Sequence, residues 1–210
     1  MLNHPLYKQL SGYQIILGSK SPRRQEILRN NLGIDNFTIV ESNFAEDLVI
    51  DDPLEYVTAT SHHKAKAILN QNKFDEPTIV ITCDTIVSCN NHILEKPMTK
   101  EKQQEFFQIY KQYKEVQVIS AVTIFKIDKD GKASEYADQC TSTLSFNDHE
   151  GADDLVNAYI DSEEGLDVAG GFRFQEFGSL LFNSLQGDYF NVVGLPVSIT
   201  FELLSRAVLV

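Results

Sequence analysis

The chain contains 210 residues, of which 42% are hydrophobic, and its formal net charge is −12. This length and apolar content allow a substantial core and exclude a chain that is mainly disordered. The acidic balance excludes nucleic-acid binding through a broad basic face, because neutralising backbone phosphates requires clustered Lys and Arg. No stretch is apolar for long enough to cross a bilayer, and the start lacks the layout of a signal peptide, so we expect a cytoplasmic protein without a membrane partner.

The three cysteines indicate a reducing compartment. Cys83, Cys89 and Cys140 form neither a CxxC pair nor an even set for disulfides. Because free cysteine is among the most buried residue types, we interpret all three as core thiols.

The first half of the chain begins with a strand and two helices. Residues 13–18 are predicted to form a short buried strand, and residues 22–31 a helix that ends before Gly33, where glycine can take the left-handed cap. A second helix begins at Asp52-Pro53, because Pro fits the first helical position. Its stripe at helical spacing comprises Leu54, Val57, Ser61, Ala65 and Ile68.

The middle of the chain contributes a strand and a third helix. Residues 78–87 form an apolar, β-branched run that is typical of a strand covered on both faces. Thr99 can cap the helix that follows. The apolar side of this helix carries Phe106, Tyr110 and Tyr113.

The last part of the chain contains a hairpin and two helices. Residues 116–127 and 134–146 are predicted strands, and residues 128–131 join them, since Asp and Gly tolerate the positive φ of a hairpin turn. A helix over about residues 150–160 and a Gly-rich stretch follow, and a final helix begins near Pro196. Strands mixed with helices and a hairpin predict the α/β class with a mixed sheet.

The most informative segment is the basic start of the first long helix, residues 17–24 (LGSKSPRR). Ser21 is a natural N-cap and Pro22 fits the first position, so Arg23 and Arg24 fall in the first turn. The amino end of a helix already carries about half a positive charge and favours acidic residues there. Backbone amides, hydroxyls and guanidinium groups at one helix end therefore indicate a site for a polyphosphate.

A structural alternative for the two arginines is an ion pair on the surface. Arg23 and Arg24 could pair with carboxylates such as Glu26 or Asp47. Surface pairs contribute little to stability and would not explain the two serines of the segment.

Asp84 is the candidate acidic group of the site. It lies within the apolar strand, where an ionised carboxylate is costly unless a metal or a cation compensates it. Such a carboxylate can ligate Mg²⁺ or accept a proton from an attacking water, and Thr85 adds a hydroxyl. The alternative is an Asp that caps a turn at the end of the strand.

Four further residues fit either a site or an ordinary surface. Lys96 precedes a rigid Pro, and Lys64 borders an apolar stripe, where it can reach a ligand or extend to solvent. Glu46 lies in an acidic loop. Gln175 follows Gly170-Gly171, a stretch that a ligand can approach closely or that simply forms a tight turn.

Other chemistries have less support. His62 and His63 are adjacent and point in different directions from a helix, unlike the i, i+4 pair of a zinc site. The sequence contains no GxSxG elbow, Walker loop or GxGxxG fingerprint, which disfavours serine hydrolases, P-loop enzymes and dinucleotide-binding folds.

Five motifs in order carry a family resemblance. They are residues 16–28 (ILGSKSPRRQEIL), 83–87 (CDTIV), 94–97 (LEKP), 169–175 (AGGFRFQ), and 187–189 with 193–196 (GDY and VGLP). Together they resemble the motifs of the Maf family of nucleoside triphosphate pyrophosphatases over residues 13–204. We therefore interpret residues 1–210 as a single Maf-like domain.

The resemblance implies a fold and an activity. The expected fold is like that of the inosine triphosphate pyrophosphatases, an elongated mixed sheet flanked by helices, with two lobes and a central cleft. The expected enzyme is a hydrolase of acid anhydrides, which uses Mg²⁺ or Mn²⁺ to convert a nucleoside triphosphate into the monophosphate and pyrophosphate. By analogy with the family, a homodimer is a possible assembly.

The resemblance also implies residue roles. Asp84 matches the presumed proton acceptor, and Glu46 would assist it in holding the metal. Lys64 and Lys96 would neutralise charge in the transition state. The residues expected to hold the phosphates are Ser19, Ser21, Arg23 and Arg24.

Arg23, Thr85 and Gln175 match positions associated with substrate choice in the branch that prefers dTTP, UTP and modified pyrimidine nucleotides. The pattern thus favours pyrimidine triphosphates and a role in clearing nucleotide pools. Two alternatives stay open, a purine or 7-methyl-GTP pyrophosphatase of the same fold, and a nucleotide-binding regulatory protein with weak or no turnover.

The sequence departs from the family pattern at two places. Residues 112–118 (QYKEVQV) replace a Ser-Gly-x-x-His-x-Val stretch, with neither the Gly nor the His, and Ala45 replaces an Asp that commonly precedes Glu46. We expect an altered loop before the strand and fewer carboxylates near a metal, with an effect on turnover more than on the type of reaction.

Overall fold

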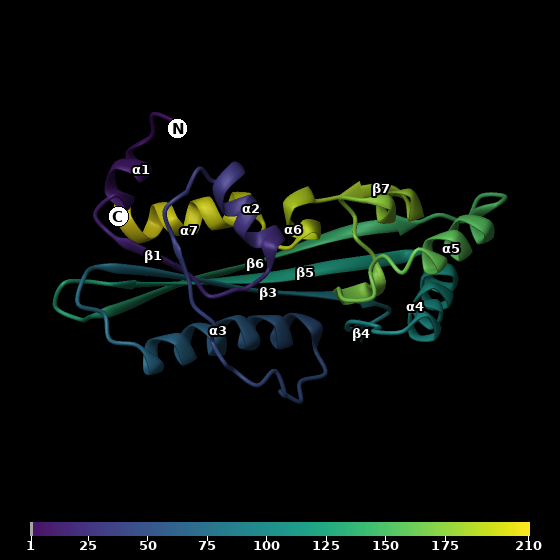
Figure 1. Ribbon diagram of the computed structural model, residues 1–210, viewed down its shortest axis with the longest axis horizontal. Coiled ribbons are helices and arrows are strands. Elements are labelled where there is room, and N and C mark those ends of the chain that lie inside the picture. Colours follow the sequence, from purple (N-terminus) through teal and green to yellow (C-terminus); the bar gives the residue numbers. More distant parts are fainter. Residues whose placement is uncertain (1) are drawn as a thin grey trace.

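The computed structural model describes residues 2–210, and Figure 1 shows one elongated sheet with helices on both faces. The helices are α1 (Pro5–Leu10), α2 (Pro22–Asn30), α3 (Pro53–Gln71), α4 (Lys100–Tyr113), α5 (Ala152–Asp161), α6 (Tyr189–Val193) and α7 (Val197–Leu209), with 3-10 turns η1 (Ala169–Gly171) and η2 (Phe177–Leu181). The strands are β1 (Gln14–Leu17), β2 (Thr38–Ile39), β3 (Thr78–Cys89), β4 (His92–Leu94), β5 (Glu115–Ile127), β6 (Ala133–Phe146) and β7 (Phe182–Gln186).

The sheet is mixed, as the sequence predicts. Its strand order is β2-β1-β3-β5-β6-β7, and β4 pairs with β3. β1 is parallel to β2 and β3, whereas the other pairs are antiparallel. The predicted hairpin joins β5 to β6, and Gly131 takes a φ of +76° in its turn. The α/β class with an elongated mixed sheet is thereby confirmed.

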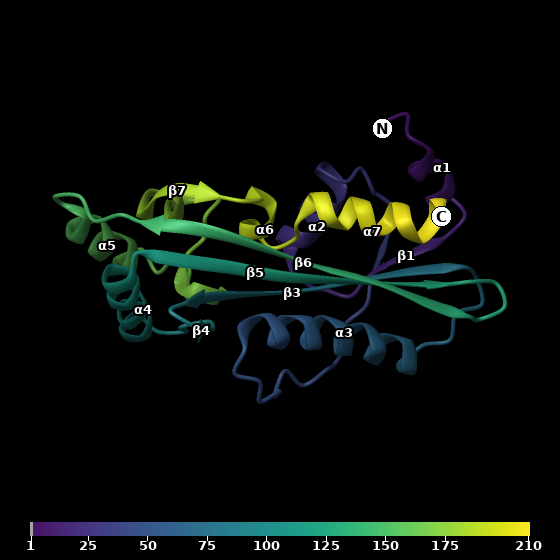
Figure 2. The same cartoon turned by 180° about the vertical axis from the view of Figure 1, so that it is seen from behind.

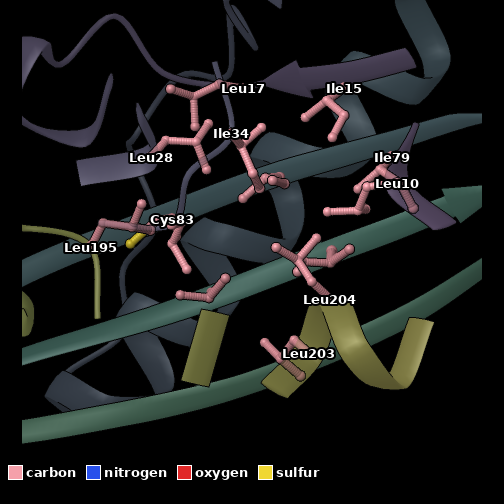
Figure 3. Close-up of a cluster of buried hydrophobic side chains, with 14 of the residues drawn as sticks. Leu10, Ile15, Leu17, Leu28, Ile34, Ile79, Cys83, Leu195, Leu203 and Leu204 are labelled. Atoms are coloured by element: carbon pink, nitrogen blue, oxygen red, sulfur yellow. The ribbon is translucent and has the colours of Figure 1, made fainter. Parts of the chain in front are cut away.

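The side chains of β3 alternate between two helical layers, because successive residues of a strand point to opposite faces. Ile79, Ile81 and Cys83 face α1, α2 and α7, in the buried cluster that Figure 3 shows in close-up. Val80 lies on the other face, against Ala65 and other residues of α3. Figures 1 and 2 show α3 below the sheet and α2 and α7 above it. Both faces of β3 are therefore covered, as its apolar sequence predicts.

A second large cluster fills the opposite end of the sheet. Phe107 and Tyr110 of α4 pack there against Val87 of β3 and Tyr159 of α5. Tyr113, expected on the buried side of α4, is 40% exposed, because it lies at the last turn and Phe107 takes the place near the sheet. The two clusters correspond to two lobes that share the long strands β3, β5 and β6.

Helix caps follow the local sequence. Ser21 accepts the Arg24 amide, and the side chains of Asp52 and Thr99 each accept an amide of the first turn of the helix that follows. The elements that sequence patterns do not reveal are short: α1, β2, β4, α6 and β7 have at most six residues each. Segments of this length have little propensity of their own and form through tertiary pairing.

One edge of β3 has a gap, and this gap positions the site. β1 pairs with residues 78–81 of β3, and β4 pairs with residues 87–89 on the same edge. The intervening residues, 82–86, include Asp84 and Thr85. These two residues also separate Cys83, in the first cluster, from Val87, in the second.

Within residues 2–210, none of the helices combines the length and apolar character needed to span a membrane. The three cysteines are free thiols; Cys83 and Cys89 are buried, as predicted, whereas Cys140 is partly exposed.

Candidate active site

The start of α2 has the predicted cap geometry. Ser21 Oγ accepts the Arg24 amide at 3.5 Å, and the Ser21 amide donates to Ser19 Oγ at 3.2 Å. Ser19 is 8% exposed. Lys20, in the same segment, forms an ion pair with Glu41. The serines and arginines of the segment therefore define the helix start, and Lys20 is turned to a loop.

Arg24 is held by neutral groups on all three nitrogens. Nε donates to the Gly194 carbonyl at 2.8 Å, Nη1 to Ser19 Oγ at 3.2 Å, and Nη2 to Thr85 Oγ1 at 3.1 Å. Within residues 2–210, no ion pair joins Arg23 or Arg24 to a carboxylate. The surface ion pair considered from the sequence is thus wrong, and the charge of Arg24 stays uncompensated.

Arg23 has a free guanidinium beside a second arginine. Burial, and next the positive charge of Arg24, lower the pKa of Arg23, and Arg173 acts in the same direction. The buried Nε of Arg23 has no hydrogen-bond partner in the part of the chain described. Arg173 is paired with both oxygens of Asp167, at 2.8 and 3.0 Å. Arg23 is therefore the less satisfied of these two arginines, as a group that binds an anion would be.

Asp84 is buried and paired with Lys64. Lys64 Nζ lies 2.7 Å from Asp84 Oδ1 and 2.9 Å from Glu46 Oε1. Asp84 and Lys64 are 5% and 8% exposed. The turn-cap alternative for Asp84 is thereby wrong, because the residue lies inside β3 and faces α3. Three sequence candidates meet here, and Lys64 reaches a partner in the interior.

Tyr56 lies near the carboxylates of Asp84, Glu95 and Glu46, and sequence reasoning singled out neither Tyr56 nor Glu95. Burial, and then the negative charge of Asp84, raise the pKa of Tyr56, with further contributions from Glu95 and Glu46. Tyr56 lies eight positions before Lys64 on α3, a spacing that puts both near one face of the helix. This spacing was the sequence signal that could have identified Tyr56 as a neighbour of the Lys64 site.

The anion site and the carboxylate lie on opposite faces of the sheet. Asp84 faces α3, whereas the next residue, Thr85, faces α2 and contacts Arg24. They are brought together because β1 ends at the position opposite Ile81, so that the edge of β3 is open beside them. A ligand at this edge can reach both groups.

A divalent ion fits the two carboxylates that share Lys64. Mg²⁺ is often bound by one or two carboxylates together with substrate phosphates and water. Asp84 and Glu46 lie close enough to contact one ammonium group, and each has a second oxygen. Within residues 2–210, no cluster of three or more His, Cys, Asp or Glu side chains has the arrangement of a metal site. Substrate oxygens would thus have to complete the shell.

The two glycines of the GGFRFQ segment serve packing. Gly170 and Gly171 have φ values of +75° and +74°, and a Cβ on Gly170 would lie 2.6 Å from the Val87 side chain. Tyr110 and Gln103 donate to the carbonyls of Gly170 and Gly171, so these carbonyls are satisfied within the protein. Gly170 also donates to the Glu95 carbonyl at 3.2 Å, which ties this segment to the loop of Lys96.

Gln175 and Lys96 both have exposed side chains. Lys96 directly follows Glu95, whose carbonyl accepts the Gly170 amide. Gln175 lies five positions after Gly170. The structure therefore anchors their backbones and leaves their side chains accessible.

The departure at residues 112–118 lies away from the site. Val116, at the place of the family's His, is fully buried in the second cluster. Lys114 ends α4 with a φ of +66°, a conformation that glycine adopts more easily. The expected difference in this loop and its expected effect on turnover stay predictions.

An α/β protein in which an open sheet edge joins a basic helix start to a buried carboxylate has the arrangement of a phosphate-binding site. The model of the family described as Maf-like protein matches residues 14–207. The chain belongs to the Maf family.

Relatives cover nearly the whole chain. A dTTP/UTP pyrophosphatase of Saccharomyces cerevisiae (strain ATCC 204508 / S288c) is 37% identical over 91% of this chain and 89% of its own length. One of Pyrococcus furiosus is 38% identical over 91% of this chain and 94% of its own length. Among solved structures, a HAM1 protein from Coxiella burnetii is 10% identical, with a TM-score of 0.37 over 64% of this chain and 73% of that chain.

Proposed function

We propose that this protein hydrolyses dTTP, UTP or modified pyrimidine triphosphates to the monophosphate and pyrophosphate. The observation that carries the proposal is the buried Asp84–Lys64 pair at the sheet edge where the basic start of α2 also lies. The names of the relatives supply the substrate class. Clearing of nucleotide pools in the cytoplasm is the corresponding cellular role, and three free thiols suit that compartment.

The phosphate groups bind at the start of α2. Ser19, Ser21 and the free guanidinium of Arg23 supply donors, and Arg24 adds its charge. Lys96 extends from the adjacent loop to neutralise charge on the leaving pyrophosphate. Gln175 would read the base; its side chain is exposed, and the Gly170 amide five positions earlier donates to the Glu95 carbonyl beside Lys96.

Asp84 accepts the proton of the attacking water. Lys64 engages Oδ1, which leaves Oδ2 for the water. As the water oxygen bonds to the α-phosphorus, the bond from that phosphorus to the bridging oxygen breaks and pyrophosphate leaves. Asp84 and Glu46 would also hold Mg²⁺ or Mn²⁺, which polarises the phosphoryl oxygens when bound.

Residues 1–210 form a single domain in this proposal. The three longest strands, β3, β5 and β6, have residues in both of the large hydrophobic clusters or packed against them. Separation into two independent modules would cut these strands.

A panel assay tests the proposed function. Purified protein with Mg²⁺ or Mn²⁺ is incubated with dTTP, UTP, ITP and 7-methyl-GTP, and pyrophosphate and monophosphate are measured. We expect preference for dTTP and UTP, and a loss of about a thousandfold in Asp84→Asn. Asp75→Asn, at an exposed residue outside the site, is the matched control. Release of orthophosphate and a diphosphate would refute attack at the α-phosphorus, and binding of UTP without turnover would refute an enzyme.

A further inference from the structure

The hydroxyl of Thr85 has three oxygen or nitrogen partners at hydrogen-bonding distance within the protein. A threonine hydroxyl has one donor proton and two acceptor lone pairs. Thr85 donates to the Gly194 carbonyl at 3.2 Å and accepts from Arg24 Nη2 at 3.1 Å. Ser120 Oγ lies 2.8 Å away. Either hydroxyl can donate in this contact, and in both cases Arg24, Gly194 and Ser120 surround the Thr85 hydroxyl with protein partners.

Ser120 is the interior end of this network. It lies on β5 directly opposite Thr85 in the register and is fully buried. None of the five sequence motifs contains it. A buried hydroxyl bonded to Thr85 fixes the rotamer in which Thr85 accepts from Arg24.

Ser19 is the outer end of the network. Its Oγ accepts from Arg24 Nη1 at 3.2 Å and from the Ser21 amide at 3.2 Å, which occupies both lone pairs. The hydroxyl proton remains, and within residues 2–210 no acceptor receives it. Ser19 can therefore act toward a ligand only as a donor, which is the role that a phosphate oxygen requires.

We propose that Arg24, Thr85 and Ser120 are positioning residues, which hold Ser19 so that its hydroxyl donates to a phosphate oxygen of the substrate. The inference rests on the proposed pyrophosphatase function. Arg24 contributes its charge and its hydrogen bond to Ser19. Arg23, whose Nε has no protein partner in the described chain, contacts the substrate directly.

The network acts on the chemical step more than on binding. A donor fixed toward a phosphate oxygen becomes more valuable as negative charge develops in the transition state. A change in Thr85 or Ser120 therefore lowers kcat, whereas loss of a direct phosphate contact at Arg23 mainly raises KM.

A kinetic double-mutant cycle tests the inference with dTTP. Thr85→Val, which removes the hydroxyl at nearly equal volume, is expected to lower kcat about tenfold, as is Ser120→Ala, and Thr85→Ser is expected to restore most of the loss. In a Ser19→Ala background, Thr85→Val should have less than about a twofold effect, because both changes act through one donor. Arg23→Lys should raise KM. Thr58→Val, at an exposed threonine of α3, is the control for the same chemical change.

Equal effects of Thr85→Val in the wild-type and Ser19→Ala backgrounds would overturn the inference, as would an increase in KM at unchanged kcat. A second cycle needs no substrate. Arg24→Met and Thr85→Val are combined, and the equilibrium constants of unfolding in urea are compared. We expect their effects to be non-additive by about fivefold, and additive effects would overturn the network. Absence of pyrophosphate release from the wild-type protein would refute the proposed function, while this second cycle would still decide the network.

Discussion

Lys64 Nζ donates a 2.7 Å hydrogen bond to Asp84 Oδ1, and both residues are more than nine-tenths buried. The pair connects α3 with the middle of β3. Removal of one partner leaves the other charge buried without compensation, which costs about 3 kcal/mol or more. We therefore expect Lys64→Met to lower the free energy of unfolding by about 3 kcal/mol and to abolish activity, measured by urea unfolding and pyrophosphate release.

The control for this variant is Lys73→Met, at an exposed residue, which should change stability by less than about 0.5 kcal/mol. Equal stability of the two variants would contradict a buried pair between Lys64 and Asp84.

Gly170 and Gly131 have nearly the same φ, +75° and +76°, in different surroundings. A Cβ on Gly170 would lie 2.6 Å from Val87 Cγ2, whereas a Cβ on Gly131 would meet nothing within 4 Å. The left-handed backbone alone costs an L-residue about 1 kcal/mol. We expect Gly131→Ala to cost about this amount and Gly170→Ala about 3 kcal/mol, because overpacking is added. Thermal unfolding of both variants measures the difference, and equal losses would show that Gly170 is needed for its φ alone.

Lys114 takes a φ of +66° at the end of α4, where its amide donates to the Tyr110 carbonyl at 2.8 Å. Glycine adopts this conformation without a clash of the Cβ. Lys114→Gly is therefore expected to raise the free energy of unfolding by about 1 kcal/mol, reduced by the loss of an exposed ion pair with Asp148. Denaturant unfolding checks this. A matched Lys111→Gly change, inside α4, should destabilise, so destabilisation by both variants would contradict the assigned cap.

Asp167 links stability to pH through Arg173. The hydrogen bonds from Arg173 lower the pKa of Asp167. This stabilisation is fully present above the unfolded-state pKa of about 3.9 and is lost as pH falls through the lower folded-state pKa. We expect the stability difference between the wild-type protein and Asp167→Asn to be constant from about pH 5 to 7 and to shrink below about pH 4. Urea unfolding at several pH values measures it, and a difference that grows on acidification would reverse the assignment.

Sequence reasoning succeeded where the signal is local. The start of α2 follows from Ser21 and Pro22, because caps are short-range hydrogen bonds. It failed for Tyr113, since the exposure of this residue depends on how α4 meets the sheet.

The sequence by itself determined the class of fold, the long elements and the cluster of residue types suited to phosphate, because periodicity, caps and charge are properties of neighbouring residues. Only the tertiary structure decided that Lys64 pairs with Asp84, that Thr85 is bonded to Ser120 and Gly194, and that Arg23 is the free arginine. These contacts join residues 20 to 109 positions apart. Strand register and the gap between β1 and β4 decide which polar groups meet across such separations. No local sequence pattern encodes the register or the gap.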